Sequence, residues 1–115
     1  MNKPESTRQQ RVAGQIQKDI SEILLKEGSS LAHGSMVSVT KVRMSPDLAL
    51  AKVYLSVFPF ANADEVLQRM RNGAATIRYE LGKRIGKQLR TVPELAFFID
   101  DSLEYIEHLD KLMKQ

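Results

Sequence analysis

The sequence predicts an α+β domain in which helices cover one face of a three-stranded sheet. Apolar residues recur every three or four positions, as on one face of a helix, over residues 6–27, 62–85 and a short C-terminal helix, 102–114. Three shorter segments have the β-branched or alternating pattern of strands, residues 37–44, 49–57 and 95–99. With 115 residues, of which 43% are apolar, we expect residues 1–115 to form a single domain with its own core.

The first segment is predicted to be an amphipathic helix over residues 6–27. Its apolar residues lie on one stripe, Val12, Ile16, Ile20, Ile23 and Leu24. Gly28-Ser29-Ser30 is expected to end the helix, because glycine adopts the left-handed conformation of helix C-termini and serine favours turns. Residues 31–36 are then a connector.

A β-hairpin is predicted next. The turn residues Ser45-Pro46-Asp47 separate the strand over residues 37–44 from the strand over residues 49–57, which alternates between apolar and polar side chains. In the first strand the apolar residues change parity between Val39 and Val42. This change predicts a β-bulge near Thr40-Lys41.

The second helical segment is expected to be long and interrupted. Asn62 and Glu65 have the spacing of a capping box at its start. Its apolar stripe continues to Ile85, but Asn72-Gly73 interrupts the pattern, and Thr91-Val92-Pro93 ends it. Four large residues are expected in the core or at its edge, Met44, Phe58, Phe60 and Met70.

Positive charge is concentrated in one segment, although the net charge is only +3. Residues 69–90 hold seven cations and one anion, Glu80, whereas the last sixteen residues hold five acids and two lysines. Such segregation is typical of a face that attracts phosphate backbones. A solvated face whose cations only keep the protein soluble has the same pattern, so charge alone leaves both interpretations open.

The chain shows no catalytic or metal-binding motif. It has no cysteine, and His33 and His108 stand apart without a nucleophile or phosphate-loop motif. The acids near the C-terminus are interpreted as a solvated helix face with Asp101 as its cap. We therefore expect a protein that is not an enzyme and has neither cofactor nor metal. No signal peptide or membrane span is expected, which favours a cytoplasmic location.

Six short motifs in register resemble the bacterial ribosome-binding factor A family, RbfA. They are Arg8-Gln9-Gln10-Arg11-Val12, Ser45-Pro46-Asp47-Leu48, Ala51-Lys52-Val53-Tyr54-Leu55-Ser56, Ile77-Arg78-Tyr79-Glu80-Leu81-Gly82-Lys83 with Leu89-Arg90, Val92-Pro93-Glu94-Leu95, and Phe97-Phe98-Ile99-Asp100-Asp101-Ser102. Each motif alone is weak, but together they span nearly the whole chain.

The resemblance implies a type II KH-like fold with the order α-β-β-α-kinked α-β. It also implies a factor that assembles the small (30S) ribosomal subunit, binds immature 16S rRNA, promotes its late processing and folding, and matters most during cold growth. Other assembly factors or a GTPase would act with it. The family has an Ala-x-Gly kink where KH domains have Gly-x-x-Gly. Here the triplet is Gly73-Ala74-Ala75, and residues 84–88 are two residues longer than the family norm.

Eight cations are the candidate nucleic-acid-binding residues, Arg8, Arg11, Arg69, Arg71, Arg78, Lys83, Lys87 and Arg90. On one continuous helix, four of them project to within about 60° of one another. They predict a basic ridge made of Arg69, Lys83, Lys87 and Arg90. Arg8 and Arg11 oppose the helix dipole in the first turn, which points to a phosphate partner or to simple exposure. Arg84 is interpreted as a structural residue, with Glu80 one helical turn away as the expected ion-pair partner.

The polar side of the hairpin carries a second group of candidates. Tyr54 is either a base-stacking ring or an ordinary strand residue. For Lys41, Arg43 and Lys52, solvation is the simpler role. Two functions besides ribosome assembly stay open, a generic KH-like RNA-binding protein and a protein-interaction module without a ribosomal role. We expect a monomer with no membrane partner.

Overall fold

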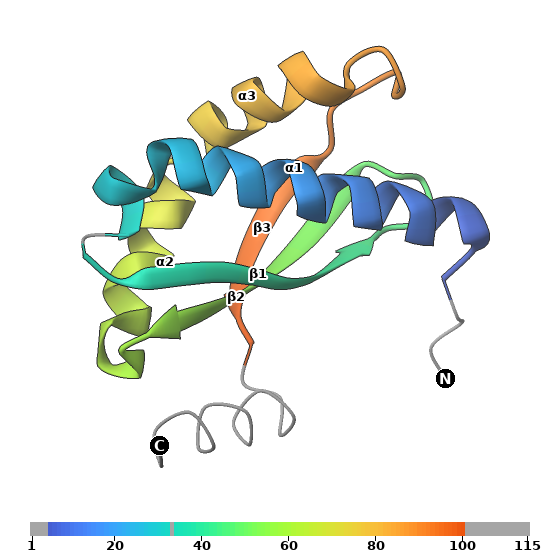
Figure 1. Cartoon of the computed structure of the whole chain (residues 1–115). Coiled ribbons are helices and arrows are strands. Elements are labelled where there is room, and N and C mark those ends of the chain that lie inside the picture. Colours follow the sequence, from blue (N-terminus) through green and yellow to red (C-terminus); the bar gives the residue numbers. More distant parts are fainter. Residues whose placement is uncertain (1–4, 33, 101–115) are drawn as a thin grey trace.

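The structure is a computed structural model that describes residues 5–32 and 34–100, and it has the predicted α+β architecture. Figure 1 shows helices α1 and α3 on one face of the sheet, with α2 beside its edge. The elements follow in the order α1 (Thr7–Ala32), β1 (Met36–Met44), β2 (Leu50–Phe58), a 3-10 turn η1 (Phe60–Asn62), α2 (Ala63–Asn72), α3 (Ala74–Ile85) and β3 (Glu94–Ile99). The predicted helix over residues 102–114 lies outside the described residues.

The sheet is mixed, with strand order β1-β2-β3. β1 and β2 form the predicted antiparallel hairpin, and β3 returns to lie parallel to β2, with Leu50 opposite Glu94 and Leu55 opposite Ile99. The register of the hairpin shifts between Val39 and Lys41, which confirms the predicted bulge. Because the bulge adds one residue to β1, the apolar side chains on both sides of it face the core.

The core lies between the helices and the covered face of the sheet. Ile16 and Ile20 from α1 meet Val53 and Leu55 from β2 and Phe97 from β3, and each is at most 1% exposed. Burying side chains of this size removes about 1.5–3 kcal/mol of unfavourable hydration each, so this layer is a large stabilising contribution to the fold. Met44 and Met70 are buried in the same core, as predicted.

Helix α1 is longer than predicted. It runs through Gly28-Ser29-Ser30 to Ala32, so the expected end at Gly28 is wrong. An internal glycine costs a helix about 1 kcal/mol, but it keeps its N–H and carbonyl groups, and the helix therefore continues. None of the helices in the described part of the chain could span a membrane.

Two expectations around the start of α2 are also wrong. The Asn62 side chain makes no capping bond to α2 and instead donates to Ser35 Oγ at 3.0 Å, because the 3-10 turn before α2 changes the chain direction there. Phe58 and Phe60 are 46% and 52% exposed, so they do not border the core. They flank Pro59 at the end of β2, where the strand leaves the covered face.

Gly73 separates α2 from α3, which confirms the predicted interruption. Its N–H donates to Arg69 O at 2.9 Å, and its carbonyl accepts from the Ile77 N–H at 3.1 Å. Its backbone, with φ −92° and ψ 6°, has left the helical region, so the two helices take different directions. Residues 69–90 therefore do not lie on one continuous helix.

Candidate nucleic-acid interface

Five of the eight predicted RNA-binding cations gather at one end of the molecule, where the first turn of α1, helix α3 and residues 86–93 meet. We call this group the basic end; it consists of Arg8, Arg11, Arg78, Lys83 and Arg90. They line three open hollows in overlapping sets: Arg8 with Arg11, Arg8 with Arg78 and Arg90, and Arg78 with Lys83 and Arg90. All five residues are exposed. The fold thus joins cations that lie far apart in the chain.

A capping box positions Arg8 and Arg11. The Ser6 hydroxyl accepts a hydrogen bond from the Gln9 N–H at 3.1 Å, and the Gln9 side chain accepts one from the Ser6 N–H at 2.8 Å. This reciprocal pair satisfies two backbone donors at the start of α1. No acidic residue lies in the first turn of this helix as the structure describes it, so the positive end of the helix dipole adds to the two guanidinium charges.

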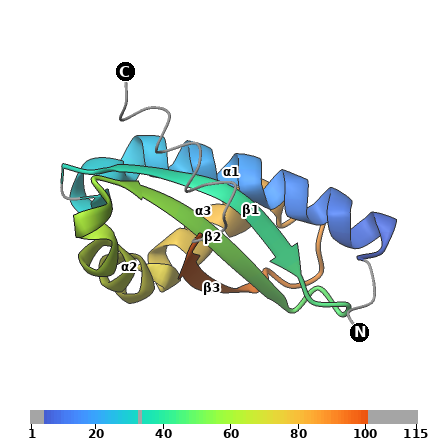
Figure 2. The same ribbon diagram turned by 90° about the horizontal axis from the view of Figure 1, so that it is seen from below.

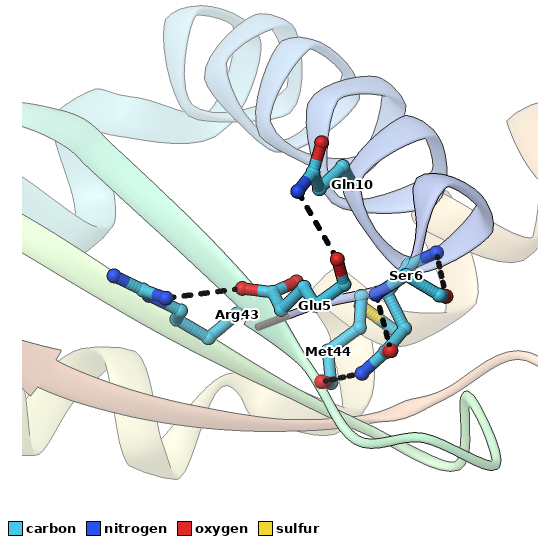
Figure 3. Close-up of polar contacts among 6 residues, drawn as sticks. Glu5, Ser6, Gln10, Arg43 and Met44 are labelled. Atoms are coloured by element: carbon cyan, nitrogen blue, oxygen red, sulfur yellow. Dashed lines mark hydrogen bonds and ion pairs between the residues drawn. The ribbon is translucent and has the colours of Figure 1, made fainter. Parts of the chain in front are cut away.

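The start of α1 is also tied to the hairpin. The Gln9 side chain donates to Met44 O at 3.0 Å, at the end of β1. Figure 3 shows the second connection, in which the Glu5 carboxylate receives the Arg43 guanidinium at 3.3 Å and the Glu5 carbonyl accepts from Gln10. These contacts hold the first turn, and with it Arg8, against the sheet.

Part of the Arg78 guanidinium group forms hydrogen bonds within the fold. Its Nη2 donates to Val92 O at 2.7 Å, and its Nε donates to Pro93 O at 3.1 Å. These bonds join α3 to the segment that precedes β3, which contains Arg90. Arg78 therefore supports the basic end as well as contributing charge to it.

Lys83 lies between an acid and an aromatic ring on α3. Its ammonium is 3.4 Å from Glu80 Oε1 and 4.7 Å from the centre of the Tyr79 ring. The lysine side chain is 56% exposed, so solvent screens both contacts and leaves the ammonium available to another anion.

Arg90 and Lys87 are exposed and lie beyond the end of α3, in the loop over residues 86–93. The prediction that four cations form a ridge on one helix face is therefore wrong, because α3 ends at Ile85 and Gly73 separates it from α2. Packing holds the loop close to α3: a methyl group added at Gly82 would approach the Val92 side chain to 3.1 Å. Arg90 consequently lines the same hollow as Arg8.

Arg69, Arg71 and Arg84 lie apart from the basic end. On α2, Arg69 pairs with Glu65 at 3.3 Å, and Arg71 donates to the Phe97 carbonyl of β3 at 3.1 Å. Arg84 contacts the Glu22 carboxylate on α1, so the expected pair with Glu80 is wrong. The contact joins α3 to α1, and Arg84 therefore does have the structural role that the sequence suggested. Each of these guanidinium groups connects or stabilises elements of the scaffold.

Two carboxylates limit the positive potential of this surface. Glu94 and Asp47 line the same hollow as Arg8, Arg78 and Arg90. The Ser45 hydroxyl donates to the Asp47 carboxylate at 2.7 Å and so does the Ala49 N–H at 3.1 Å, and these bonds hold the pKa of Asp47 below its usual value of 3.8. The group is thus an anion near neutral pH, and a phosphate would approach the arginine side of the hollow.

The chemistry of the basic end suits a phosphate backbone rather than a small substrate. Its hollows are open, and exposed guanidinium groups surround an apolar floor that includes Val12, Ile85 and Leu89. Cations of this kind gain affinity by releasing counterions from a nucleic acid, without reading the bases.

Tyr79 was not among the residues predicted from the sequence. Its side chain is 67% exposed on α3 and lines the hollow that holds Lys83 and Arg90. The available signal was its spacing, since Tyr79 and Lys83 are four residues apart and therefore neighbours on a helix. An exposed ring beside three cations can stack on a base or a ribose.

Comparison with known proteins gives consistent matches. A family model described as Ribosome-binding factor A matches residues 8–113. A protein of that name from Flavobacterium psychrophilum is 44% identical over 110 residues, which cover 95% of this chain and 85% of the relative. The crystal structure of ribosome-binding factor A from Thermus thermophilus matches with a TM-score of 0.70 and 18% identity, over 82% of this chain and 98% of that one. A homology model of the Thermus thermophilus protein, fitted into a cryo-EM map of a 30S complex, matches with a TM-score of 0.62 and 20% identity. The match covers 78% of this chain and 92% of that one.

Proposed function

The chain belongs to the ribosome-binding factor A family, and we propose that it assists assembly of the small ribosomal subunit by binding immature 16S rRNA through the basic end. In this role it promotes late processing and folding of the rRNA, and it matters most when growth is cold. It acts in the cytoplasm as a monomer and by binding alone, without catalysis, alongside other assembly factors or a GTPase.

The observation that carries the proposal is the convergence of Arg8 and Arg90 on one hollow. Both residues are exposed, and within residues 5–32 and 34–100 neither has an ion-pair or hydrogen-bond partner among the side chains. Arg8 and Arg90 therefore lack a side-chain counter-charge of their own, although Asp47 and Glu94 line the same hollow. A phosphate backbone supplies the missing counter-charge. The 30S complex of the Thermus thermophilus relative supports the choice of the small subunit as the partner.

Shape rather than sequence would provide specificity. Arginine and lysine side chains contact phosphates, and the deep major groove of A-form RNA is too narrow for side chains to read its bases. The protein would therefore select a folded rRNA surface whose phosphates match the spacing of the basic end. Loss of that surface when the rRNA matures would release the protein.

The test compares two charge-matched double variants in binding to purified small subunits. Arg8→Gln with Arg90→Gln removes two cations from the basic end, whereas Lys18→Gln with Lys26→Gln removes two exposed cations from the middle of α1. We expect the first pair to weaken binding about ten-fold or more and to lower the slope of log affinity against log salt by about two. The control pair should change the affinity by less than about two-fold and should leave the salt slope nearly the same. Equal effects of the two pairs would defeat the proposal.

Cells provide the test of the assembly role. A strain without the gene for this protein should accumulate unprocessed 16S rRNA and grow slowly in the cold. The control variant should restore growth, and the Arg8→Gln, Arg90→Gln variant should not. Restoration by both would separate assembly from the basic end.

A further inference from the structure

Cations and aromatic rings lie on the side of the sheet that faces away from α1 and α3. We call this side the open face. Figure 2 views the molecule from this side. Cross-strand partners share a face, and the register places Lys41 beside Tyr54 and Tyr54 beside Phe98, with Arg43 beside Lys52 in the next row. The open face is thus defined by Lys41, Arg43, Lys52, Tyr54 and Phe98.

The two rings form a small stacking platform. The Tyr54 and Phe98 ring centres are 5.5 Å apart, and the ring planes differ by 29°. The Lys41 ammonium lies 4.7 Å from the centre of the Tyr54 ring. Both rings are half-buried and belong to the polar side of strands whose other side forms the core. As cross-strand partners the rings stabilise the sheet by about 0.2–1 kcal/mol, and outside the core the same pair can also serve as a platform for a base.

Positive charge surrounds the platform. Arg43 and Lys52 are exposed, and Lys41 is half-buried over the Tyr54 ring. Among the described residues, three carboxylates lie on or beside the open face. Glu5 pairs with Arg43 at 3.3 Å, Glu94 lies at the start of β3 opposite Leu50, and buried Asp100 accepts a hydrogen bond from Thr40 Oγ1. The Arg43 side chain remains 60% exposed despite its ion pair. Glu5 and Asp100 are largely buried and engaged by Arg43 and Thr40, so the exposed charges of this face are Arg43 and Lys52 against Glu94, and they favour a polyanion as the occupant.

We propose that the open face is a second RNA-binding surface, on which bases of a single-stranded segment stack against Tyr54 and Phe98 while Lys41, Arg43 and Lys52 contact the flanking phosphates. Aromatic rings with nearby cations are the means by which proteins bind single strands without sequence preference. A base–ring stack is at least as strong as a partly exposed cation–π contact, so an incoming base can displace Lys41 from Tyr54 toward a phosphate. This surface is distinct from the basic end, which contacts phosphates of folded RNA.

The first experiment measures binding of a labelled oligouridylate of about twelve nucleotides by fluorescence anisotropy, with the full chain. Tyr54→Leu removes the ring and should weaken binding about ten-fold, whereas Tyr54→Phe keeps the ring and should stay within about two-fold. Lys52→Gln should lower the salt slope by about 0.7, and the matched change Lys18→Gln on α1 should leave it unchanged. In the Arg8→Gln, Arg90→Gln background, Tyr54→Leu should weaken binding by the same factor, because the two surfaces act independently.

A second measurement uses the unaltered chain and so does not depend on the stability of any variant. Ring-proton resonances of Tyr54 and Phe98 should shift when the oligouridylate is added, because a stacked base shields them. The proposal would be overturned if other resonances shifted and those of both rings did not. So would equal losses in Tyr54→Leu and Tyr54→Phe. Failure of the unaltered chain to bind the oligouridylate would also overturn it, in favour of a protein occupant.

Discussion

Arg78 is hydrogen-bonded to Val92. Its guanidinium Nη2 on α3 donates to the Val92 carbonyl oxygen at 2.7 Å, and its Nε donates to the neighbouring Pro93 carbonyl oxygen at 3.1 Å. The fork of an arginine can serve two adjacent carbonyls, whereas a lysine ammonium cannot match that geometry. The pair therefore fastens the loop that contains Arg90 to the helix that contains Lys83.

We expect Arg78→Lys to destabilise the fold although it preserves the charge. Hydrogen bonds from a charged donor contribute about 1.5–3 kcal/mol, and partial exposure places this contact near the lower limit, so the loss should be about 1–2 kcal/mol. Urea unfolding followed by circular dichroism measures it. Lys83→Gln, a charge change in the same hollow, should alter stability by less than about 0.5 kcal/mol. Equal stability of Arg78→Lys and the unaltered chain would show that charge, not geometry, is what this position requires.

The capping box at Ser6 gives a second prediction. Ser6→Ala should lower the free energy of unfolding by about 1 kcal/mol, because the Gln9 N–H loses its acceptor at the start of α1. Ser6→Asp should retain most of the stability, since a carboxylate accepts the same bond and suits the helix dipole. Thr7→Ala is the neighbouring control, with an expected change below about 0.5 kcal/mol. Thermal melts of the three variants decide the matter, and identical losses for Ser6→Ala and Thr7→Ala would count against a specific cap.

Most of the fold could be predicted because its signals are local. The alternation along residues 49–57, the change of parity that marks the bulge and the break at Gly73 each depend on a few adjacent residues. Where the predictions were wrong, two local signals competed. Gly28 is a weak helix terminator, and at Asn62 the 3-10 turn from Phe60 overrode the capping spacing.

The candidate site was predicted less completely, since it is a product of tertiary structure. No local pattern brings Arg8 to Arg90, and none tells that Arg71 and Arg78 donate to backbone carbonyls. The ridge prediction assumed a continuous helix over residues 69–90. Once the helix breaks at Gly73 and ends at Ile85, Arg69 stays on α2, Lys83 and Arg90 belong to the basic end, and Lys87 lies in the loop after α3.

The hairpin turn should show a pH-dependent contribution to stability. Hydrogen bonds from Ser45 and Ala49 hold the pKa of Asp47 below 3.8, so its folded-state pKa lies below its unfolded-state value. For an acid shifted in this direction, the stabilisation is present above the unfolded pKa and is lost as the pH falls through the folded pKa. Asp47→Ala should therefore have a lower melting temperature than the unaltered chain, by a constant amount above about pH 5 and by a shrinking amount below about pH 4.

Asp47→Asn is the control for that experiment. Asparagine keeps an oxygen acceptor for the turn but does not titrate in this range, so its own stability curve should lack the Asp47 component. A gap between Asp47→Ala and the unaltered chain that stays the same from about pH 2 to about pH 7 would contradict the assignment.

Two glycines make a matched pair in which the same substitution has opposite effects. At Gly14, an exposed position inside α1, an added methyl group meets nothing within 4 Å, whereas at Gly86 it would lie 2.6 Å from the Gly82 carbonyl oxygen. Gly14→Ala should stabilise the protein by about 0.5–1 kcal/mol, because alanine loses less backbone entropy in a helix. Gly86→Ala should destabilise it by about 1–3 kcal/mol, since the backbone at the end of α3 must move to relieve the contact.

Urea unfolding of both alanine variants provides the measurement, with unchanged m-values as the check that only stability has changed. The Gly86 variant carries a further consequence, because the loop that begins there contains Arg90. Movement of that loop should weaken binding to small subunits in Gly86→Ala and leave it unaffected in Gly14→Ala, even under conditions in which both variants are fully folded. If Gly86→Ala proved as stable as Gly14→Ala, the tight approach of residue 86 to Gly82 would not exist in solution, and the placement of Arg90 against α3 would have to be revised.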